Sequence, residues 1–325
     1  MRLLPTFLLT ICYLFITDIV IAANPRPSNN AQQHQLIIVS WNLQWLSVAK
    51  GKTKKIIRTS SDMAYLAKLI TDISPDILAF QEVDNLEAIQ AILPTSGYKI
   101  LLSTRTQQPD EIFPVQNQFT GFAVKNSLRV TDNPDLRDLN LPFSRKQKRR
   151  KNTRKLRYGS YITVKTTNSK EFHILNVHLK SGCFSQKSSF KSTPCRVLRK
   201  QGHILNNWIK TRNKRNESYL VLGDFNHHLN SKHQWLLSTI NASLSKPAIL
   251  LSEQITAKCT ISYSNKNGRK KRRRYRYLID HALGSDKIAQ LIIPNGNIFQ
   301  YQYPAGAINQ HQLSDHCPLI LHLPL

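Results

Sequence analysis

The sequence is poor in acidic residues. Only 19 Asp and Glu stand against 46 Lys and Arg, so the 325-residue chain has a formal net charge of +27. A surplus of this size does not determine a fold, but it predicts affinity for polyanions such as nucleic acid, anionic lipid or acidic polysaccharide. An acidic metabolite alone would not require it. Apolar residues make up 41% of the chain, which is enough to bury a core and excludes disorder throughout.

The chain also lacks a long apolar segment beyond its N-terminus, because no later stretch is long or apolar enough to cross a membrane. At the N-terminus, Arg2 supplies a positive start, the run from Leu3 to Ile16 is largely apolar, and Ala22-Ala23 offers small residues for cleavage. This is the layout of a secretory signal peptide. A membrane anchor is the alternative, although Asp18 ends the apolar run before the about 20 residues that a span needs. We therefore expect a signal peptide at 1–23 and a secreted or periplasmic protein with no transmembrane segment.

No CxxC pair occurs, so a zinc or thioredoxin-type site has little support. Removal of the signal peptide would leave Cys183, Cys195, Cys259 and Cys317. An even number of cysteines in an oxidising compartment favours two disulfides. Cys183 and Cys195 flank a short loop rich in Ser and Lys, which makes them the local pair and leaves Cys259 for Cys317. Four free buried thiols would be the alternative if the chain were not exported.

Neither an internal repeat nor a long linker divides the rest of the chain. A polar lead-in at 24–35 precedes short apolar runs that alternate with helical patterns, and we expect one domain at 36–325. Fully apolar strand runs indicate sheets that are covered on both faces. Helices are predicted at Asp62–Ile73, across Val197 to Arg212 and at Trp235–Ile240. Strands are predicted at Leu36–Val39, Ile77–Phe80, Gly121–Val124, Tyr161–Val164, Phe172–Val177, Tyr219–Leu222, Tyr277–Leu283 and Leu319–Leu323.

Acidic side chains are absent from two strongly basic stretches. Residues Arg145 to Arg157 include nine basic side chains, and Lys266 to Arg276 include eight. The simplest interpretation of each stretch is a solvated, mobile loop. A patch that binds polyanions is the alternative.

Most predicted strands are followed directly by polar side chains of the kinds that catalyse reactions. Each group alone has an ordinary structural explanation, such as a turn residue or a helix cap. Together they are hard to attribute to chance, because strand ends are where a layered α/β protein gathers its site. The groups are SWNL at 40–43, QEV at 81–83, NVHLKS at 176–181, GDFN at 223–226, IDH at 279–281 and SDHCP at 314–318.

In identity and order, these six groups resemble the endonuclease/exonuclease/phosphatase superfamily, which has the DNase I-like fold. The resemblance runs from Ser40 to Pro318, nearly the whole mature chain. It implies a four-layer α/β sandwich, in which two packed mixed sheets are flanked by helices, and hydrolysis of phosphoester bonds at one rim.

The resemblance also implies the roles of the site residues. Glu82 would be the main ligand of Mg²⁺, or of Mn²⁺ or Ca²⁺, with Asn42 beside it and Asp315 nearby; hard oxygen ligands suit these ions. Asp280 and His316 would form a dyad. Asp224 would orient or deprotonate the attacking water, Asn226 would hold the water or a phosphate oxygen, and His178 would donate to a non-bridging oxygen.

The substrate contacts are predicted from charge and position. Arg157 and Tyr158 stand where many relatives carry an Arg that contacts a substrate phosphate, and both basic stretches would be insertions whose roots lie close to the site. No base-reading motif is visible, so binding should be insensitive to sequence. In the abasic-site nucleases of this superfamily an aromatic residue commonly follows the Asp of the dyad. Here His281 follows Asp280 and no Trp stands just before it, so the resemblance does not extend to abasic-site repair. The other predicted substrate-binding residues are Lys180, Lys270, Lys271, Arg272, Arg273 and Arg274.

These observations predict a secreted, Mg²⁺-dependent nuclease of low sequence specificity that acts as a monomer on the phosphate backbone of DNA or RNA. A sphingomyelinase or a phosphoinositide phosphatase of the same superfamily is the first alternative, since basic loops also suit anionic lipid. No extended apolar hairpin that would enter a bilayer is visible, which disfavours it. A non-catalytic cationic protein that coats polyanions is the second alternative, and it would have no use for the six groups.

Overall fold

The structure is a computed structural model, and it describes residues 35–49, 56–113, 115–141, 143–144, 153–166, 171–184, 192–231, 234–264 and 270–324. The predicted signal peptide at 1–23, the lead-in as far as residue 34, and residues 145–152 and 266–269 of the basic insertions lie outside the described residues. Among the helices that are described, none combines the length and apolar character needed to span a membrane.

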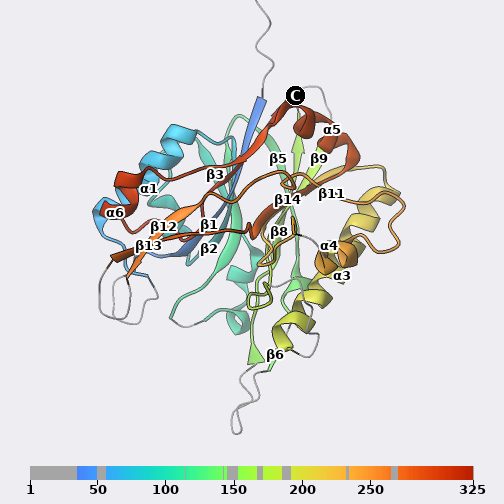
Figure 1. Cartoon of the computed structure of the whole chain (residues 1–325), viewed down its shortest axis with the longest axis horizontal. Helices are drawn as coiled ribbons and strands as arrows, with labels where there is room; N and C mark the ends of the chain where they lie inside the picture. The colour runs from blue at the N-terminus through green and yellow to red at the C-terminus, as the bar shows by residue number, and fades with distance from the viewer. Residues whose placement is uncertain are drawn as a thin grey trace, which may run out of the picture. The chain divides into compact units, whose positions relative to one another are not determined.

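Two mixed sheets of six strands each organise the described residues (Figure 1). Within each sheet one central pair is parallel, β1 with β2 and β9 with β10, and the other pairs are antiparallel. The first sheet has the order β15 (Ile298–Gln300), β16 (Leu319–Pro324), β1 (Gln35–Leu46), β2 (Ile77–Val83), β4 (Phe119–Lys125) and β3 (Tyr98–Leu102). The second has the order β11 (Ile249–Leu250), β14 (Asp280–Gly284), β10 (Ser218–Asp224), β9 (Glu171–His178), β8 (Gly159–Lys165) and β5 (Arg129–Leu136).

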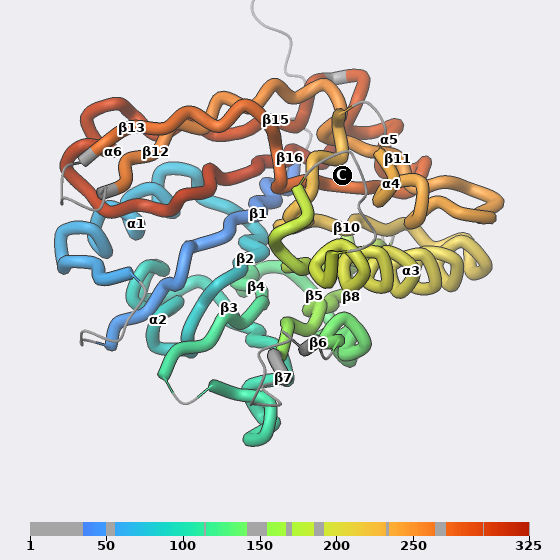
Figure 2. Tube along the Cα trace, turned by 60° about the horizontal axis from the view of Figure 1, so that its bottom comes forward, coloured from blue at the N-terminus to red at the C-terminus, as the bar shows by residue number. Residues whose placement is uncertain are grey.

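Helices cover the outer face of each sheet, on opposite sides of the strands in Figure 2. The first sheet is covered by α1 (Ser60–Ile73), α2 (Leu86–Gln90) and α6 (Ala305–Gln310), and the second by α3 (Thr193–Lys214) and α4 (Trp235–Ile240). A further helix, α5 (Asp286–Ile292), packs against β10 and β16. Short 3-10 turns occur at Thr104–Gln107, Pro109–Glu111, Arg137–Leu139 and Ile293–Asn295.

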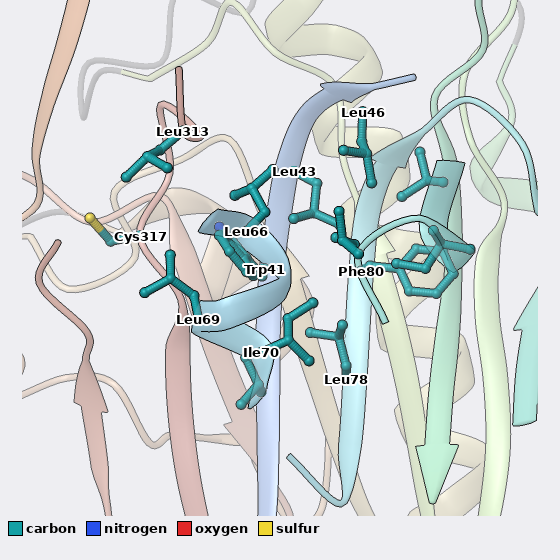
Figure 3. Close-up of a cluster of buried hydrophobic side chains, with 14 of the residues drawn as sticks. Trp41, Leu43, Leu46, Leu66, Leu69, Ile70, Leu78, Phe80, Leu313 and Cys317 are labelled. Carbon is teal, nitrogen blue, oxygen red and sulfur yellow. The ribbon is translucent and has the colours of Figure 1, made fainter. Parts of the chain in front are cut away.

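Apolar side chains fill the spaces between these layers. On the outer face of the first sheet, Leu66 and Leu69 of α1 pack against Trp41 of β1 and Phe80 of β2 (Figure 3). The inner faces of the two sheets share a second cluster, which includes Ile38, Ala79, Phe122, Ile174 and Leu222. A third cluster joins α3 and α4 to the outer face of the second sheet. The predicted four-layer α/β sandwich is therefore confirmed.

A buried amide network fixes the two sheets to each other beside the ends of β2 and β9. The side-chain amide of Asn176 donates to the carbonyls of Phe80 and Gly121, at 2.9 and 2.8 Å. Gln81 Nε2 donates to Asn176 Oδ1 at 2.7 Å. Satisfied buried networks of this kind are rigid and specific in geometry. The residues that follow, Glu82 on β2 and His178 on β9, are thereby held in register across the two sheets.

The second basic stretch differs from the predicted loop. Its residues Lys270–Arg274 form β13, which pairs residue by residue with β12 (Thr260–Ser264) in a separate two-stranded sheet that we call the basic hairpin. A second small sheet pairs β6 (Phe143–Ser144) with β7 (Thr153–Arg154). The strand predicted at Tyr277–Leu283 begins only at Asp280, because the chain bends between the end of the basic hairpin and the second sheet.

Candidate active site

Glu82 lies at the end of β2, where the strand departs from regular geometry. Its φ is +60°, a value that residues other than glycine rarely adopt, and the register of β2 against β4 shifts between Phe80 and Val83. This irregular end places the Glu82 carboxylate beside β1. Oε1 accepts from Asn42 Nδ2 at 3.2 Å, and Oε2 accepts from the Trp45 amide at 3.1 Å.

Asn42 joins the acidic groups of the two sheets. Its Oδ1 accepts the Gln44 amide at 2.9 Å, which turns its NH₂ group toward the carboxylates. Nδ2 then donates both to Glu82 and to Asp224 Oδ2, the latter at 3.1 Å. In this orientation Asn42 aligns the two carboxylates as a hydrogen-bond donor, so its predicted role as a metal ligand through oxygen stays a prediction.

Asp224 ends β10, and the glycine before it permits its position. Gly223 has φ +135°, and a Cβ atom there would lie 2.0 Å from the carbonyl oxygen of Val177, so any other residue would force β9 and β10 apart. The carboxylate accepts from the Asn226 amide and from Asn226 Nδ2, both at 2.8 Å. Burial raises the pKa of Asp224 to about 7 even though the nearby charge of His316 opposes the shift.

His316 and Asp280 form the predicted dyad. His316 Nδ1 lies 2.8 Å from Asp280 Oδ2, and its Nε2 faces Asp315 Oδ1 at 3.8 Å and Asp224 Oδ2 at 4.0 Å. Burial by itself would lower the pKa of His316, but the charge and hydrogen bond of Asp280 and the charges of Asp224 and Asp315 outweigh it and hold the pKa well above its ordinary value. A dyad of this kind keeps Nδ1 protonated and aims Nε2 into the site.

Several contacts hold the segment that carries His316. Ser314 Oγ donates to the Asn42 carbonyl at 2.6 Å and accepts from the His316 amide at 3.0 Å. The His316 carbonyl accepts from Tyr303 Oη at 2.5 Å and from Trp41 Nε1 at 3.2 Å. The next residue, Cys317, forms a disulfide with Cys259 at a Cα–Cα distance of 5.7 Å. The backbone of His316 is therefore tied to β1 and to the basic hairpin.

Arg58 is a positioning residue that the sequence reasoning missed. Its guanidinium donates to the carbonyls of Leu43, Gln312 and Leu313 at 2.9, 3.1 and 3.0 Å, so it joins the end of β1 to the start of the SDHCP segment. Burial lowers its pKa to about 10. Asp62 supports the same segment, because its Oδ1 accepts the Gln312 amide at 2.8 Å while its Oδ2 takes part in a capping box at the start of α1.

His178 faces the two carboxylates from β9. Its Nε2 lies 3.4 Å from Asp224 Oδ2 and 3.6 Å from Glu82 Oε1. Burial, followed by the positive charges of Arg157, His316 and Lys180, holds the pKa of His178 well below its ordinary value, so the ring is neutral. Ligand atoms of Glu82, His178 and Asp224 all lie within 4.8 Å of one another. This compact set of two carboxylates and a neutral imidazole has the composition of a site for a divalent cation.

These groups open into one cavity of about 570 Å³. The cavity brings together residues of five of the six sequence groups. The sixth group, SWNL at 40–43, does not line it, and its Asn42 lies fully buried behind Glu82 and Asp224. The catalytic and metal residues predicted from sequence that line it are Glu82, His178, Asp224, Asn226, Asp280, Asp315 and His316. Its other walls include Arg157, Phe184, His228, Arg273, Tyr275, Arg276 and Tyr277.

The predicted substrate-binding residues are divided between this cavity and other surfaces. Arg157 lines the cavity while one of its NH₂ groups donates to the Leu179 carbonyl at 2.8 Å. Tyr158 is buried next to it but lines a different cavity, with Arg137 over its ring. Lys180 is half-buried, and its ammonium contacts the Ser181 carbonyl at 2.5 Å.

The basic hairpin presents its charges on two faces because side chains alternate along a strand. Arg273 lies over the ring of Tyr263 and lines the cavity. Arg272 instead donates to Asn309 of α6 at 2.9 Å. Lys271 and Arg274 are exposed. The side chain of Lys270 lies outside the described residues.

Both predicted disulfides are present. Cys183 and Cys195 are joined at a Cα–Cα distance of 5.1 Å, and this bond ties the end of the NVHLKS segment to the start of α3. Cys259 and Cys317 form the second bond. Residues Tyr275, Tyr277, Phe184 and His228 also line the cavity, and the six motifs contain none of them.

Comparisons with known proteins agree with this geometry. The family model described as "Endonuclease/Exonuclease/phosphatase family" matches residues 39–316. An endonuclease/exonuclease/phosphatase family protein from Bacteroides thetaiotaomicron is 14% identical with a TM-score of 0.53, over 89% of this chain and 95% of that chain. The human nocturnin catalytic domain is 18% identical with a TM-score of 0.53, over 89% and 93%.

A mannosyl-6-phosphatase from Bacteroides thetaiotaomicron is 13% identical with a TM-score of 0.52, over 89% of this chain and 99% of that chain. At these identities the likeness shows a shared fold. Curated protein sequences contain no match. The family model spans most of the chain, from Val39 in β1 to the dyad residue His316, and the chain therefore belongs to the endonuclease/exonuclease/phosphatase family, whose members hydrolyse phosphoester bonds.

Proposed function

We propose that the protein is a secreted, divalent-metal-dependent phosphodiesterase that hydrolyses nucleic acid with little sequence preference. One observation carries the proposal: the cluster of carboxylates and imidazoles opens into the same cavity as Arg157, Arg273 and Arg276. An acidic, imidazole-rich floor suits metal-assisted cleavage of a phosphoester. Cationic walls around it suit a substrate with more than one phosphate.

The residues present fit a divalent cation. Glu82 and Asp224 bring two carboxylates within 4.8 Å of His178, and the Asn42 amide and the His178 imidazole each face both carboxylates. We propose Glu82 as the main ligand, with Asn42, Asp315 and His178 available around it, which leaves the Asp224 carboxylate for proton transfer. A bound Mg²⁺ or Mn²⁺ would neutralise negative charge that develops on the phosphoryl group.

The chain's own residues supply the proton transfers and hydrogen bonds. Asp224, whose pKa burial raises to about 7, is suited to take a proton from an attacking water near neutral pH. Asn226 fixes that carboxylate through two hydrogen bonds. His316, kept cationic by Asp280, is suited to donate from Nε2 to a phosphoryl oxygen and to stabilise the pentacovalent state.

Three cationic residues on the walls favour a polymeric substrate over a single phosphate. Arg157 lines the cavity with a mostly buried side chain, and it places a guanidinium charge beside Glu82 and Asp224. Arg273 and Arg276 belong to the basic hairpin and the bend after it. Contacts of arginine with backbone phosphates carry no base information, which is consistent with low sequence specificity.

Export and domain limits belong to the same proposal. We propose that residues 1–23 are removed, that 24–35 is a polar lead-in, and that 36–325 forms one domain with basic insertions at 145–157 and 266–276. The two disulfides support an oxidising compartment. A monomer suffices for the proposed chemistry, because Glu82, Asp224, Asp280 and His316 of a single chain meet in one cavity.

The test is a comparison of substrates with a matched inactive variant. Purified mature protein is incubated with plasmid DNA, total RNA and sphingomyelin vesicles, each with Mg²⁺ and with EDTA, beside His316→Ala. We expect cleavage of DNA or RNA that requires the metal and is lost in the variant. Hydrolysis of sphingomyelin alone would replace the nuclease by a lipid-cleaving enzyme. Binding of all polyanions without hydrolysis would leave a non-catalytic cationic protein.

A further inference from the structure

Three aromatic side chains form a stacked row on the wall of the catalytic cavity. The ring of His228 lies parallel to that of Tyr277, with centroids 4.6 Å apart and an interplanar angle of 24°. Phe184 also stacks on His228, with centroids 6.4 Å apart and an interplanar angle of 28°. All three residues line the cavity that holds Asp280 and His316. We call this row the aromatic platform.

The aromatic platform is exposed, although large aromatic rings usually dominate protein cores. Tyr277 is 55% exposed and Phe184 is 42% exposed. Exposed apolar surface beside a catalytic site is a mark of ligand binding.

The platform is also held firmly by its neighbours. Phe184 follows Cys183, whose disulfide to Cys195 fixes the chain there. The Cys183 carbonyl in turn lies 2.7 Å from Nδ1 of His227, the residue before His228. His227 is buried against the ring of Trp235. The residues that precede Phe184 and His228 are therefore fixed in place, so a ligand would meet a surface that is already ordered.

Its location is set by the catalytic segments themselves. His228 comes two residues after Asn226, and Tyr277 comes three residues before Asp280. The backbone between each pair can therefore extend over at most about 10 Å. A ring this near the dyad is within reach of a group attached next to the reacting phosphate. In a nucleic acid that group is a nucleoside.

We propose that the aromatic platform stacks an unpaired base beside the phosphate that is cut, so that the enzyme acts on single-stranded nucleic acid in preference to duplex. This inference rests on the proposed nuclease function and specifies its substrate. Every base has a face that stacks on an aromatic ring, so the contact tolerates any sequence. In a duplex the same base is paired and stacked, and it would have to leave the helix first.

The charges around the platform argue against a choline headgroup as the occupant. Aromatic rings also bind quaternary ammonium groups. Here, however, Arg276 stands directly before Tyr277, and Arg273 lines the same cavity. Their positive charges would repel a choline, whereas they would attract the phosphates on either side of a stacked base.

The experiment separates base contacts from phosphate contacts. Binding is measured by fluorescence anisotropy with Mg²⁺ in the inactive His316→Ala background, using a single-stranded DNA oligonucleotide, its duplex, and a strand of equal length built from abasic units. The variants are Tyr277→Ala, Tyr277→Phe and, as a control, Phe299→Ala, since Phe299 is 42% exposed on β15 outside the cavity. If His316→Ala folds poorly, the same Tyr277 and Phe299 substitutions are made in the enzyme that retains His316, and the KM for cleavage of each substrate is compared instead.

We expect the base-bearing strand to bind more tightly than the abasic strand. Tyr277→Ala should weaken the base-bearing strand by roughly five- to a hundredfold, the range that base–aromatic stacking covers, and leave the abasic strand unchanged. Tyr277→Phe and Phe299→Ala should bind like the parent. If the enzyme cleaves nucleic acid but binds base-bearing and abasic strands equally, the platform proposal is wrong and the nuclease stands. If it neither binds nor cleaves nucleic acid, both are wrong.

Discussion

The disulfide between Cys259 and Cys317 joins the basic hairpin to the residue after His316, and its removal should affect both stability and catalysis. The two cysteines are 58 residues apart. In the chain-entropy model, opening a loop of this length lowers the free energy of unfolding by about 4 kcal/mol at 25 °C. The other disulfide, between Cys183 and Cys195, closes a separation of 12 residues, and the same model gives about 3 kcal/mol.

Activity should distinguish the two bonds more sharply than stability does. Without its link to Cys259, the His316 backbone keeps the hydrogen bonds from Tyr303 and Trp41 but loses its covalent attachment to the cavity wall. Displacement of a catalytic group by about 1 Å can cost as much as a hundredfold in rate, so we expect kcat to fall roughly ten- to a hundredfold. Loss of the Cys183–Cys195 bond should leave kcat near the wild-type value, because that bond does not touch the dyad.

The assay compares two double serine variants, Cys259→Ser with Cys317→Ser, and Cys183→Ser with Cys195→Ser. Urea unfolding gives the free energy of each, and kcat is measured at a temperature where both proteins are fully folded. Peptide mapping without reductant first establishes both bonds in the wild type. Four free thiols in that map would refute the pairing and count against export. Equal losses of kcat in the two variants would refute the link between Cys317 and the dyad.

Glu82→Gln and His316→Ala should each lower kcat by at least ~10² while thermal unfolding stays close to that of the wild type; wild-type rates in either variant would remove these residues from the mechanism. Neutralising the basic stretch at 270–274 with glutamine should raise KM and flatten its salt dependence with kcat nearly unchanged, whereas neutralising exposed Lys214 on α3 should alter neither; parallel salt curves for wild type and hairpin variant would refute the contact. Burial acts to raise the pKa of Asp62, but its hydrogen bonds outweigh burial and the pKa is lowered. The stability that Asp62 contributes is therefore complete above its unfolded-state pKa near 3.8 and is lost as pH falls through the lower folded-state value. Asp62→Asn should accordingly reduce the free energy of unfolding at pH 7 and converge with the wild type in acid, and a difference that is constant with pH would contradict this assignment.

The central strands and the motifs after them were predictable from local sequence. Runs such as Ile77–Phe80 and Tyr219–Leu222 are apolar because both sheet faces are covered, and this pattern needs no knowledge of distant residues. The basic strand β13 was not predictable in this way. A run of like charges has no strand signature, and its pairing depends on β12 and on the nearby Cys259 disulfide.

The supporting contacts of the site were hidden for a different reason. Nothing in the local sequence distinguishes Arg58 from the other basic residues near it. Two of its hydrogen-bond acceptors, the carbonyls of Gln312 and Leu313, lie more than 250 residues away in the sequence. The direction of the Glu82 side chain depends on a strand irregularity and a positive φ, and neither has a signature in QEV. Only the tertiary arrangement reveals which lone polar residues hold the dyad in place.

The floor and the walls of the cavity differ in origin, and this explains why reaction class is easier to predict than substrate. The floor comes from strand ends such as Glu82, His178 and Asp224, whose spacing is set by the packing of two sheets and by the Asn176 amide network. The walls come from loops, the basic hairpin and the aromatic platform among them, and loops vary without disturbing the core. Six motifs can therefore identify a phosphoester hydrolase, whereas the choice between single strand, duplex and lipid lies in side chains such as Tyr277, whose neighbours no motif specifies.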